Sequence, residues 1–103
     1  MAKFMHLWRV NHSAPWPTDP TKGMQWFEMM FATIDQGLKS GQILEVGWFP
    51  NSISGYVITS GDAKDQFMSA FADYPWITAD IQEIVPYETG KELTRQVLKA
   101  KAE

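Results

Sequence analysis

Three side chains at scattered positions are of types that could move protons: His6, Glu45 and Tyr56. An imidazole changes its protonation state near neutral pH, a carboxylate accepts a proton and a phenol donates one, so together they could catalyse a proton transfer. A single histidine in an apolar strand is, however, more often a hydrogen-bonded core or interface residue. The residue types therefore permit acid–base catalysis without requiring it.

Four further residues could hold a small ligand beside them: Trp8, Arg9, Trp16 and Gly47. Gly47 has no side chain and would leave room over a sheet, while Trp16, held between two prolines in a stiff loop, could cover that room. Arg9 could bind a carboxylate, although a salt bridge at a strand end is the better explanation of an arginine there. An apolar cavity of this kind favours a small aromatic or cyclic acid, with Arg9 or His6 supplying the complementary charge.

Runs of strand-forming residues predict four strands, at 3–11, 43–49, 55–60 and 81–85. The first has bulky side chains on both faces, since Phe4, His6, Trp8 and Val10 alternate with Met5, Leu7 and Arg9. The turn-rich sequence PNSIS between the second and third strands predicts an antiparallel hairpin. Glu83 interrupts the apolar row of the fourth strand, which predicts either an edge position or a bulge there.

Capping patterns predict three helices. The first lies between Asp19-Pro20 and Ser40-Gly41, the second opens with Asp62 and Asp65 and closes at Pro75, and the third opens with Thr89 and Glu92. Apolar side chains at helical spacing predict that the first two helices pack on a sheet. The stripes are Phe27, Met30, Phe31, Ile34 and Leu38 in the first helix, and Phe67, Ala70, Phe71 and Tyr74 in the second.

The element order β-α-β-β-α-β plus a terminal helix predicts a single α+β domain over residues 1–103, of the ferredoxin-like plan with an antiparallel four-stranded sheet. Two helices on one face of that sheet would leave Phe4, Trp8, Tyr56 and Ile58 together on the other, a larger apolar patch than monomers usually expose. A second copy packed face to face would cover them. We therefore expect a homodimer that forms a dimeric α+β barrel.

A family resemblance agrees with this expectation. The start KFMHLW fits a K-x-M-x-x-W pattern, and with GWF, GYVITSGDAKD, YPW and DIQEIVP it resembles an uncharacterised family of small ferredoxin-like domains in the dimeric α+β-barrel superfamily, over roughly residues 3–88. More distantly, DPTK and YPWITADIQEI are similar to stretches of muconolactone isomerases. The resemblance implies a small, often aromatic or oxygenated ligand. No catalytic motif matches residue by residue, so it implies no catalytic residue.

Composition excludes several other functions. The chain has no cysteine, which rules out disulfides and thiolate metal sites and suits a cytoplasmic protein. Its formal charge of −3 and the lack of a basic cluster argue against nucleic-acid binding, including by an RNA-recognition module, which shares the same element order. We also expect no membrane segment, no metal site, since only His6 and His12 are available, and no cofactor.

Two functions fit these observations. The first is a homodimeric small-molecule-binding protein, which could be a cofactor-free enzyme. The second is a dimerisation module without chemistry, with a structural or regulatory role. They differ in whether the interior is hollow with converging polar groups or filled with aromatic side chains.

Overall fold

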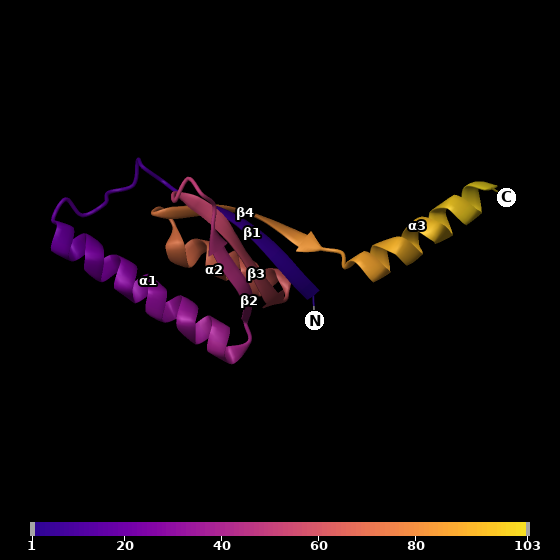
Figure 1. Cartoon of the computed structure of the whole chain (residues 1–103), viewed down its shortest axis with the longest axis horizontal. Coiled ribbons are helices and arrows are strands. Elements are labelled where there is room, and N and C mark those ends of the chain that lie inside the picture. Colours follow the sequence, from indigo (N-terminus) through magenta and orange to yellow (C-terminus); the bar gives the residue numbers. More distant parts are fainter. Residues whose placement is uncertain (1, 103) are drawn as a thin grey trace.

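Residues 2–102 are described by a computed structural model (Figure 1). The elements in chain order are β1 (Ala2–Val10), α1 (Pro20–Ser40), β2 (Ile43–Trp48), β3 (Ser54–Gly61), α2 (Ala63–Asp73), β4 (Ile77–Ile84) and α3 (Tyr87–Ala102). The strands form one sheet in the order β2-β3-β1-β4, with every neighbouring pair antiparallel. The predicted α+β class, the four strands and the three helices are therefore confirmed.

Helix α1 begins and ends where the sequence predicts. The carboxylate of Asp19 accepts a hydrogen bond from the Thr21 backbone N–H at 2.9 Å, and Pro20 fills the first turn without leaving an unpaired N–H. At the other end Gly41 has a φ of 83°, in the left-handed region that glycine adopts without strain. Its N–H bonds the Leu38 carbonyl at 3.3 Å. Local sequence alone accounts for both ends of this helix.

Helix α2 also has the predicted boundaries. The carboxylate of Asp62 accepts from the Asp65 backbone N–H at 2.9 Å, and the Asp65 carboxylate accepts in return from the Asp62 N–H at 3.2 Å. This is a reciprocal capping box. The helix ends at Asp73, because Tyr74 precedes Pro75 and a residue before proline avoids the helical conformation.

The fourth strand starts earlier than predicted. β4 begins at Ile77 rather than at residue 81, and it pairs with β1 from Val10↔Ile77 to Lys3↔Ile84. The small or polar residues Thr78, Ala79 and Asp80 after Ile77 hide this start in the sequence. Of the two positions predicted for Glu83, an edge strand or a bulge, the structure has the edge strand. The residue lies there in regular register opposite Phe4. The sheet's irregularity lies instead in β2, between Ile43 and Glu45.

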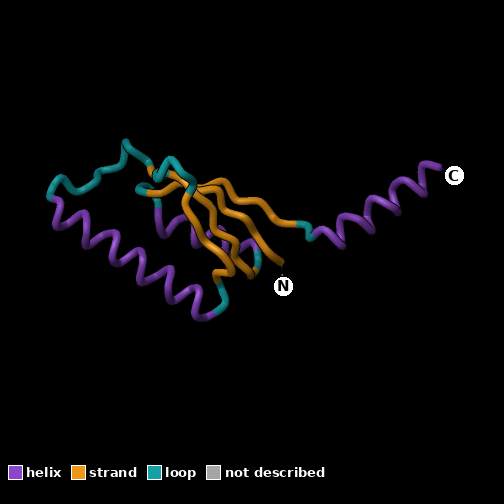
Figure 2. Tube along the Cα trace, viewed as in Figure 1, coloured by secondary structure: helices purple, strands orange, loops and turns teal. Residues whose placement is uncertain are grey.

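The predicted capping box of the last helix is wrong. The Gly90 N–H donates to the Pro86 carbonyl at 2.9 Å, so α3 starts at Tyr87 and Thr89 already lies inside it. Proline disrupts the interior of a helix but is favoured at its start, where its missing N–H would have no partner. The preference of Pro86 for a helix start therefore outweighs the capping pattern of Thr89 and Glu92. The helix points away from the sheet, and the chain is 66 Å long as a result (Figures 1 and 2).

The prediction that Phe4 and Trp8 share a face of the sheet with Tyr56 and Ile58 is wrong. Leu7 pairs with Tyr56 and Met5 with Ile58, so those residues lie together on one face. Phe4, His6 and Trp8 lie on the opposite face, which α1 and α2 cover. Because side chains alternate along a strand, one residue of register decides between the two arrangements. We call the uncovered face, with Met5, Leu7, Tyr56 and Ile58, the open face.

Helix α2 faces the sheet with a stripe next to the predicted one, and Ala70 belongs to both stripes. Its aromatic residues Phe67 and Phe71, and Tyr74 just after its end, are each 63% exposed, whereas Gln66 is only 4% exposed and faces the sheet. Hydrophobicity alone favours the aromatic stripe for the core. The contact of Gln66 with the sheet, described below, orients the helix the other way.

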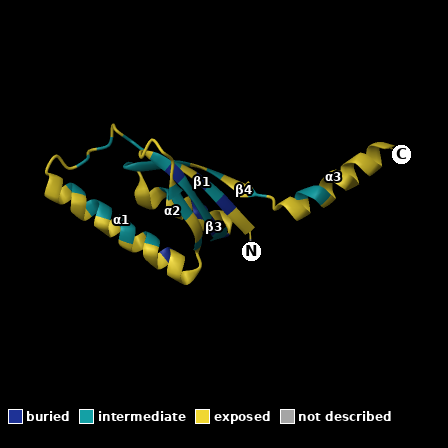
Figure 3. Cartoon of the chain, in the orientation of Figure 1, coloured by how far each residue is buried: buried dark blue, intermediate teal, exposed yellow. Residues whose placement is uncertain are grey.

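Few apolar side chains are deeply buried in the described part of the chain. Phe4, which is 7% exposed, is the single buried hydrophobic residue among residues 2–102, and the buried positions concentrate in the sheet (Figure 3). Helix α1 packs mainly along β2. The space between this helix, α2 and the covered face of the sheet is therefore a cavity rather than a filled core.

Candidate functional site

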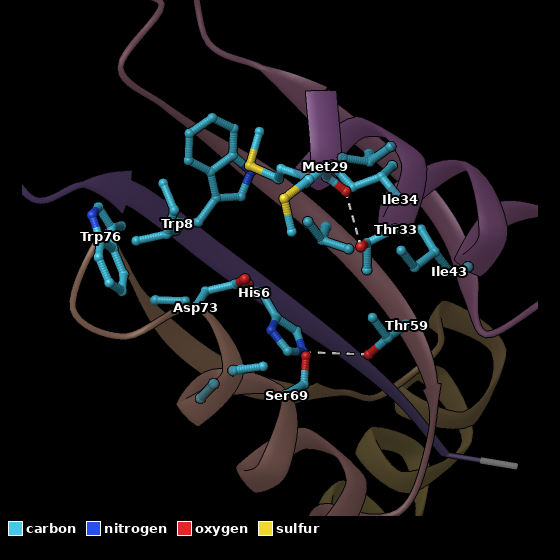
Figure 4. A pocket seen from close by; sticks show the side chains of 18 of the residues that line it. His6, Trp8, Met29, Thr33, Ile34, Ile43, Thr59, Ser69, Asp73 and Trp76 are labelled. Atoms are coloured by element: carbon cyan, nitrogen blue, oxygen red, sulfur yellow. Dashed lines mark hydrogen bonds between the residues drawn. The ribbon is translucent and has the colours of Figure 1, made fainter. Parts of the chain in front are cut away.

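A cavity of about 930 Å³ lies between α1, α2 and the covered face of the sheet (Figure 4). All four strands contribute to its floor, and the two helices form its walls. Four of the five tryptophans line it: Trp8, Trp26, Trp48 and Trp76. Ligand pockets typically measure about 300–1,000 Å³ and are mainly apolar with a few polar groups, so both the size and the lining suit a small molecule.

The tryptophans stand at angles to one another and offer ring surface in several directions. Trp8 and Trp48 meet edge to face, with ring centroids 6.2 Å apart and planes at 86°. Trp26 and Trp76 are 6.3 Å apart and tilted by 38°. Trp8 lies against β3 because Gly55 has no side chain there; a Cβ on Gly55 would come within 2.5 Å of the indole.

A buried polar cluster forms part of the floor. His6, Thr59 and Gln66 are 6%, 7% and 4% exposed. The side-chain oxygen of Gln66 lies 2.6 Å from His6 Nε2 and 2.6 Å from the Thr59 hydroxyl, and the hydroxyl lies 3.3 Å from Nε2. One carbonyl oxygen accepts both hydrogen bonds when the Nε2 atom of His6 carries a proton. The cluster joins β1, β3 and α2.

Asp73 stands beside His6 at the end of α2 (Figure 4). It follows Gln66 by two helical turns and so lies on the same side of the helix. The residue as a whole is solvent-exposed, yet its carboxyl faces the cavity, where loss of water raises the pKa of Asp73; the nearby His6 lowers it in part. A carboxylate in such a place is stabilised by any positive charge that enters the cavity.

The predicted catalytic residues are not brought together. His6 lies under the helices, while Glu45 and Tyr56 lie on the open face, so the sheet separates the histidine from the other two. The Tyr56 hydroxyl donates to the Glu45 carboxylate at 2.5 Å. That hydrogen bond is the main reason why the pKa of Tyr56 is raised. Proton transfer among all three is excluded in this arrangement.

The predicted space above Gly47 is occupied. A Cβ at this position would lie 2.8 Å from Cε1 of Tyr56, so the missing side chain makes room for the tyrosine ring rather than for a ligand. Phe49 stacks on the same ring, with centroids 6.2 Å apart. Gly47 therefore serves the packing of the open face.

Of the four predicted ligand-binding residues, Trp8 alone lines the cavity. Arg9 points to the open face, where it forms an exposed salt bridge with Asp80 at 3.8 Å. Such a salt bridge is the alternative to ligand binding expected from the sequence. Trp16 donates a hydrogen bond from Nε1 to the Asn11 carbonyl at 2.7 Å, and its ring packs on that of Trp26 with the ring centroids 4.9 Å apart. Trp16 therefore contacts Trp26, a residue that lines the cavity, and it does not cover the open face.

Sequence reasoning did not single out Gln66, Asp73, Trp48 or Trp76 as site residues. A signal for two of them exists: Gln66, Ser69, Ala70 and Asp73 follow the spacing i, i+3, i+4, i+7 and form a small polar stripe. The aromatic stripe on the next face of the same helix conceals it. The tryptophans had no distinguishing local signal.

No protein-family model matches the chain, and no curated protein or solved structure matches it either. Among residues 2–102, no three His, Asp or Glu side chains converge as metal ligands would. Within the same range no helix has the length and apolar character needed to cross a membrane.

Proposed function

We propose that this protein is a homodimeric small-molecule-binding protein whose ligand occupies the cavity between α1, α2 and the covered face of the sheet. The observation that carries the proposal is the cavity itself: about 930 Å³, lined by four tryptophans, with the polar cluster around His6 at its floor. Tryptophan supplies a large rigid contact area, and the polar groups can orient a ligand.

Binding is favoured over catalysis. The Nε2 atom of His6 is held by Gln66 at 2.6 Å, and the carboxylate of Glu45 is on the far side of the sheet. A general base needs a free acceptor within hydrogen-bonding reach of the ligand, with a partner that orients it. Among the described residues that line the cavity, the Nδ1 atom of His6 and the carboxylate of Asp73 are available for such a role, since the carboxylate of Asp65 already accepts a hydrogen bond from the Asp62 N–H.

The open face supports the homodimer. Its centre is apolar, with Met5, Leu7, Tyr56 and Ile58, and Leu7 is 41% exposed. Basic and acidic side chains lie around that centre on the same face, namely Lys3 and Arg9 with Glu45 and Asp80. A patch that carries both signs of charge around an apolar centre is complementary to a copy of itself.

The proposed assembly is the dimeric α+β barrel expected from the sequence, with two sheets packed through their open faces. The element order and the strand order β2-β3-β1-β4 agree with a ferredoxin-like subunit. In this arrangement both cavities stay on the outer sides of the barrel, so dimerisation leaves them accessible.

A second candidate is a dimerisation module without a ligand. The observation that favours it is the amount of exposed apolar surface outside the cavity, including Phe67 and Phe71 on α2 and Tyr74 just after it, each 63% exposed. Contiguous surfaces of this kind are typical of protein-binding sites. The two candidates differ in whether the cavity takes up a small molecule.

A ligand screen with a filled-cavity variant tests the proposal. Thr33 lines the cavity from α1, and Asp35 is an exposed residue on the same helix that does not line it. Small aromatic compounds are screened by thermal shift against wild type, Thr33→Trp and Asp35→Trp, since a ligand that binds the folded state raises the melting temperature. We expect hits that shift wild type and Asp35→Trp but not Thr33→Trp. A screen without hits, or hits indifferent to Thr33→Trp, would favour the dimerisation module.

A further inference from the structure

The charged groups that face the cavity are all acidic. Asp65 and Asp73 line it, whereas none of the nine Lys and Arg residues, all of which lie within residues 2–102, does so. His6 is the remaining titratable group, and its Nε2 is engaged with Gln66. A ligand carboxylate would thus meet two negative charges and no permanent positive one.

The two carboxylates differ in their freedom to bind a ligand. Asp65 already accepts the Asp62 N–H at 3.2 Å in the capping box of α2. The side-chain carboxylate of Asp73 forms no hydrogen bond or salt bridge with another residue of the described chain, and it stands at the cavity end of α2 between His6 and Trp76 (Figure 4). Asp73 is therefore the group available to pair with a charged ligand.

Aromatic surface adjoins this carboxylate. Trp76 lines the cavity three residues after Asp73 and has Trp26 as its neighbour, with ring centroids 6.3 Å apart. Trp8 and Trp48 continue the wall. The electron-rich faces of indole rings attract cations, and tryptophan is the strongest of the aromatic side chains in this interaction. A carboxylate in a cavity that several indoles line is a suitable environment for an organic ammonium group.

We propose that the cavity selects organic cations, in particular amines or quaternary ammonium compounds with an aromatic or apolar body, with Asp73 as the counter-ion and the tryptophans as the wall around the charge. This inference rests on the proposed function, because it names the ligand class of the same cavity. It replaces the small aromatic acid expected from the sequence. Of the two residues expected to bind that acid, Arg9 lies on the open face, and the Nε2 atom of His6 is engaged with Gln66.

Three probes of similar size and different charge test this selectivity: phenethylammonium, 2-phenylethanol and 3-phenylpropionate. Their affinities are measured by isothermal titration calorimetry at neutral pH and low ionic strength, with tryptophan fluorescence as a second readout. We expect phenethylammonium to bind at least about tenfold more tightly than the other two, since a charge-assisted contact and cation–π contacts act together.

Two matched variants assign the charge preference to Asp73. Asp73→Asn keeps the shape of the side chain and should reduce phenethylammonium affinity about tenfold while leaving 2-phenylethanol unchanged. Asp80→Asn removes an exposed carboxylate on the open face and should leave all three affinities unchanged. Circular dichroism of both variants verifies that they are folded.

The outcomes separate the inference from the function on which it rests. If 2-phenylethanol or 3-phenylpropionate binds as tightly as the cation, the cation selectivity is wrong and the small-molecule function stands. If Asp80→Asn lowers the affinity for phenethylammonium as much as Asp73→Asn does, general surface charge accounts for the effect and the inferred selectivity is again wrong. If none of the probes binds wild type, and the broader screen also gives no hits, both proposals fail.

Discussion

The Nε2 atom of His6 lies 2.6 Å from the side-chain oxygen of Gln66, a residue 60 positions away in the chain. Both side chains are buried, and the same oxygen also accepts a hydrogen bond from the Thr59 hydroxyl. A buried polar group is costly unless it is paired, so the three residues stabilise one another only as a set. This contact fixes which side of α2 faces the sheet.

Replacing Gln66 should therefore destabilise the fold. In Gln66→Ala the His6 Nε2 and the Thr59 hydroxyl lose their common acceptor in a buried place, which costs about 1–3 kcal/mol of unfolding free energy. Gln25→Ala, at an exposed position of α1, is the matched control and should change it by less than about 0.5 kcal/mol. Urea unfolding followed by circular dichroism measures both. Equal stability of the two variants would show that the cluster contributes nothing to the fold.

The open face should carry the contact of the proposed homodimer. Leu7→Asp places a carboxylate in the centre of that apolar face and should dissociate the dimer, because burying an unpaired charge costs several kcal/mol. Met24→Asp adds the same charge on α1, at a residue 61% exposed, and should leave the dimer intact. Multi-angle light scattering at micromolar concentration gives the mass of each. A monomeric wild type, or a Leu7→Asp protein that is still dimeric, would remove the open face as the interface.

Two glycine substitutions should act in opposite directions. In Gly47→Ala the new Cβ comes within 2.8 Å of the Tyr56 ring, so the ring must move away from its Glu45 partner, at a cost of about 1–3 kcal/mol. In Gly23→Ala, in α1, the new Cβ has no neighbour within 4 Å and should stabilise the protein by about 0.5–1 kcal/mol. Thermal unfolding distinguishes the two; a neutral Gly47→Ala would mean that the tyrosine ring does not lie against this strand.

Asp73 should make folding stability depend on pH. Burial raises its pKa in the folded protein, so the folded state retains this proton at pH values where the unfolded chain has lost it. The contribution of the Asp73 carboxyl is thus most favourable below its ordinary pKa of 3.8 and is lost as the pH rises through the raised value.

A comparison with Asp73→Asn isolates that contribution, because asparagine cannot titrate. Between pH 3 and pH 7, the unfolding free energy of Asp73→Asn should rise relative to that of wild type. Urea titrations of both proteins at intervals of half a pH unit provide the curves. A constant difference between wild type and Asp73→Asn across this range would mean that the carboxyl is not desolvated.

Much of the fold could be predicted from local sequence. Asp19-Pro20 and Gly41 mark both ends of α1, and the Asp62–Asp65 pair marks the start of α2, since caps depend on residues only a few positions apart. Strand alternation likewise predicts that His6 and Trp8 share a face and that Leu7 lies on the other. These features depend on backbone geometry over less than two turns of helix or one strand.

The candidate site could not be predicted in the same way. Whether Tyr56 lies opposite His6 or opposite Leu7 depends on the register between strands distant in sequence, and a shift of one residue exchanges the two faces. The local pattern of α2 allowed either stripe to face the sheet, and hydrophobicity favoured the aromatic one. The contact between His6 and Gln66 selects the polar stripe and thereby places Asp73 at the cavity, because a buried imidazole requires a hydrogen-bonding partner that only the folded chain can bring to it.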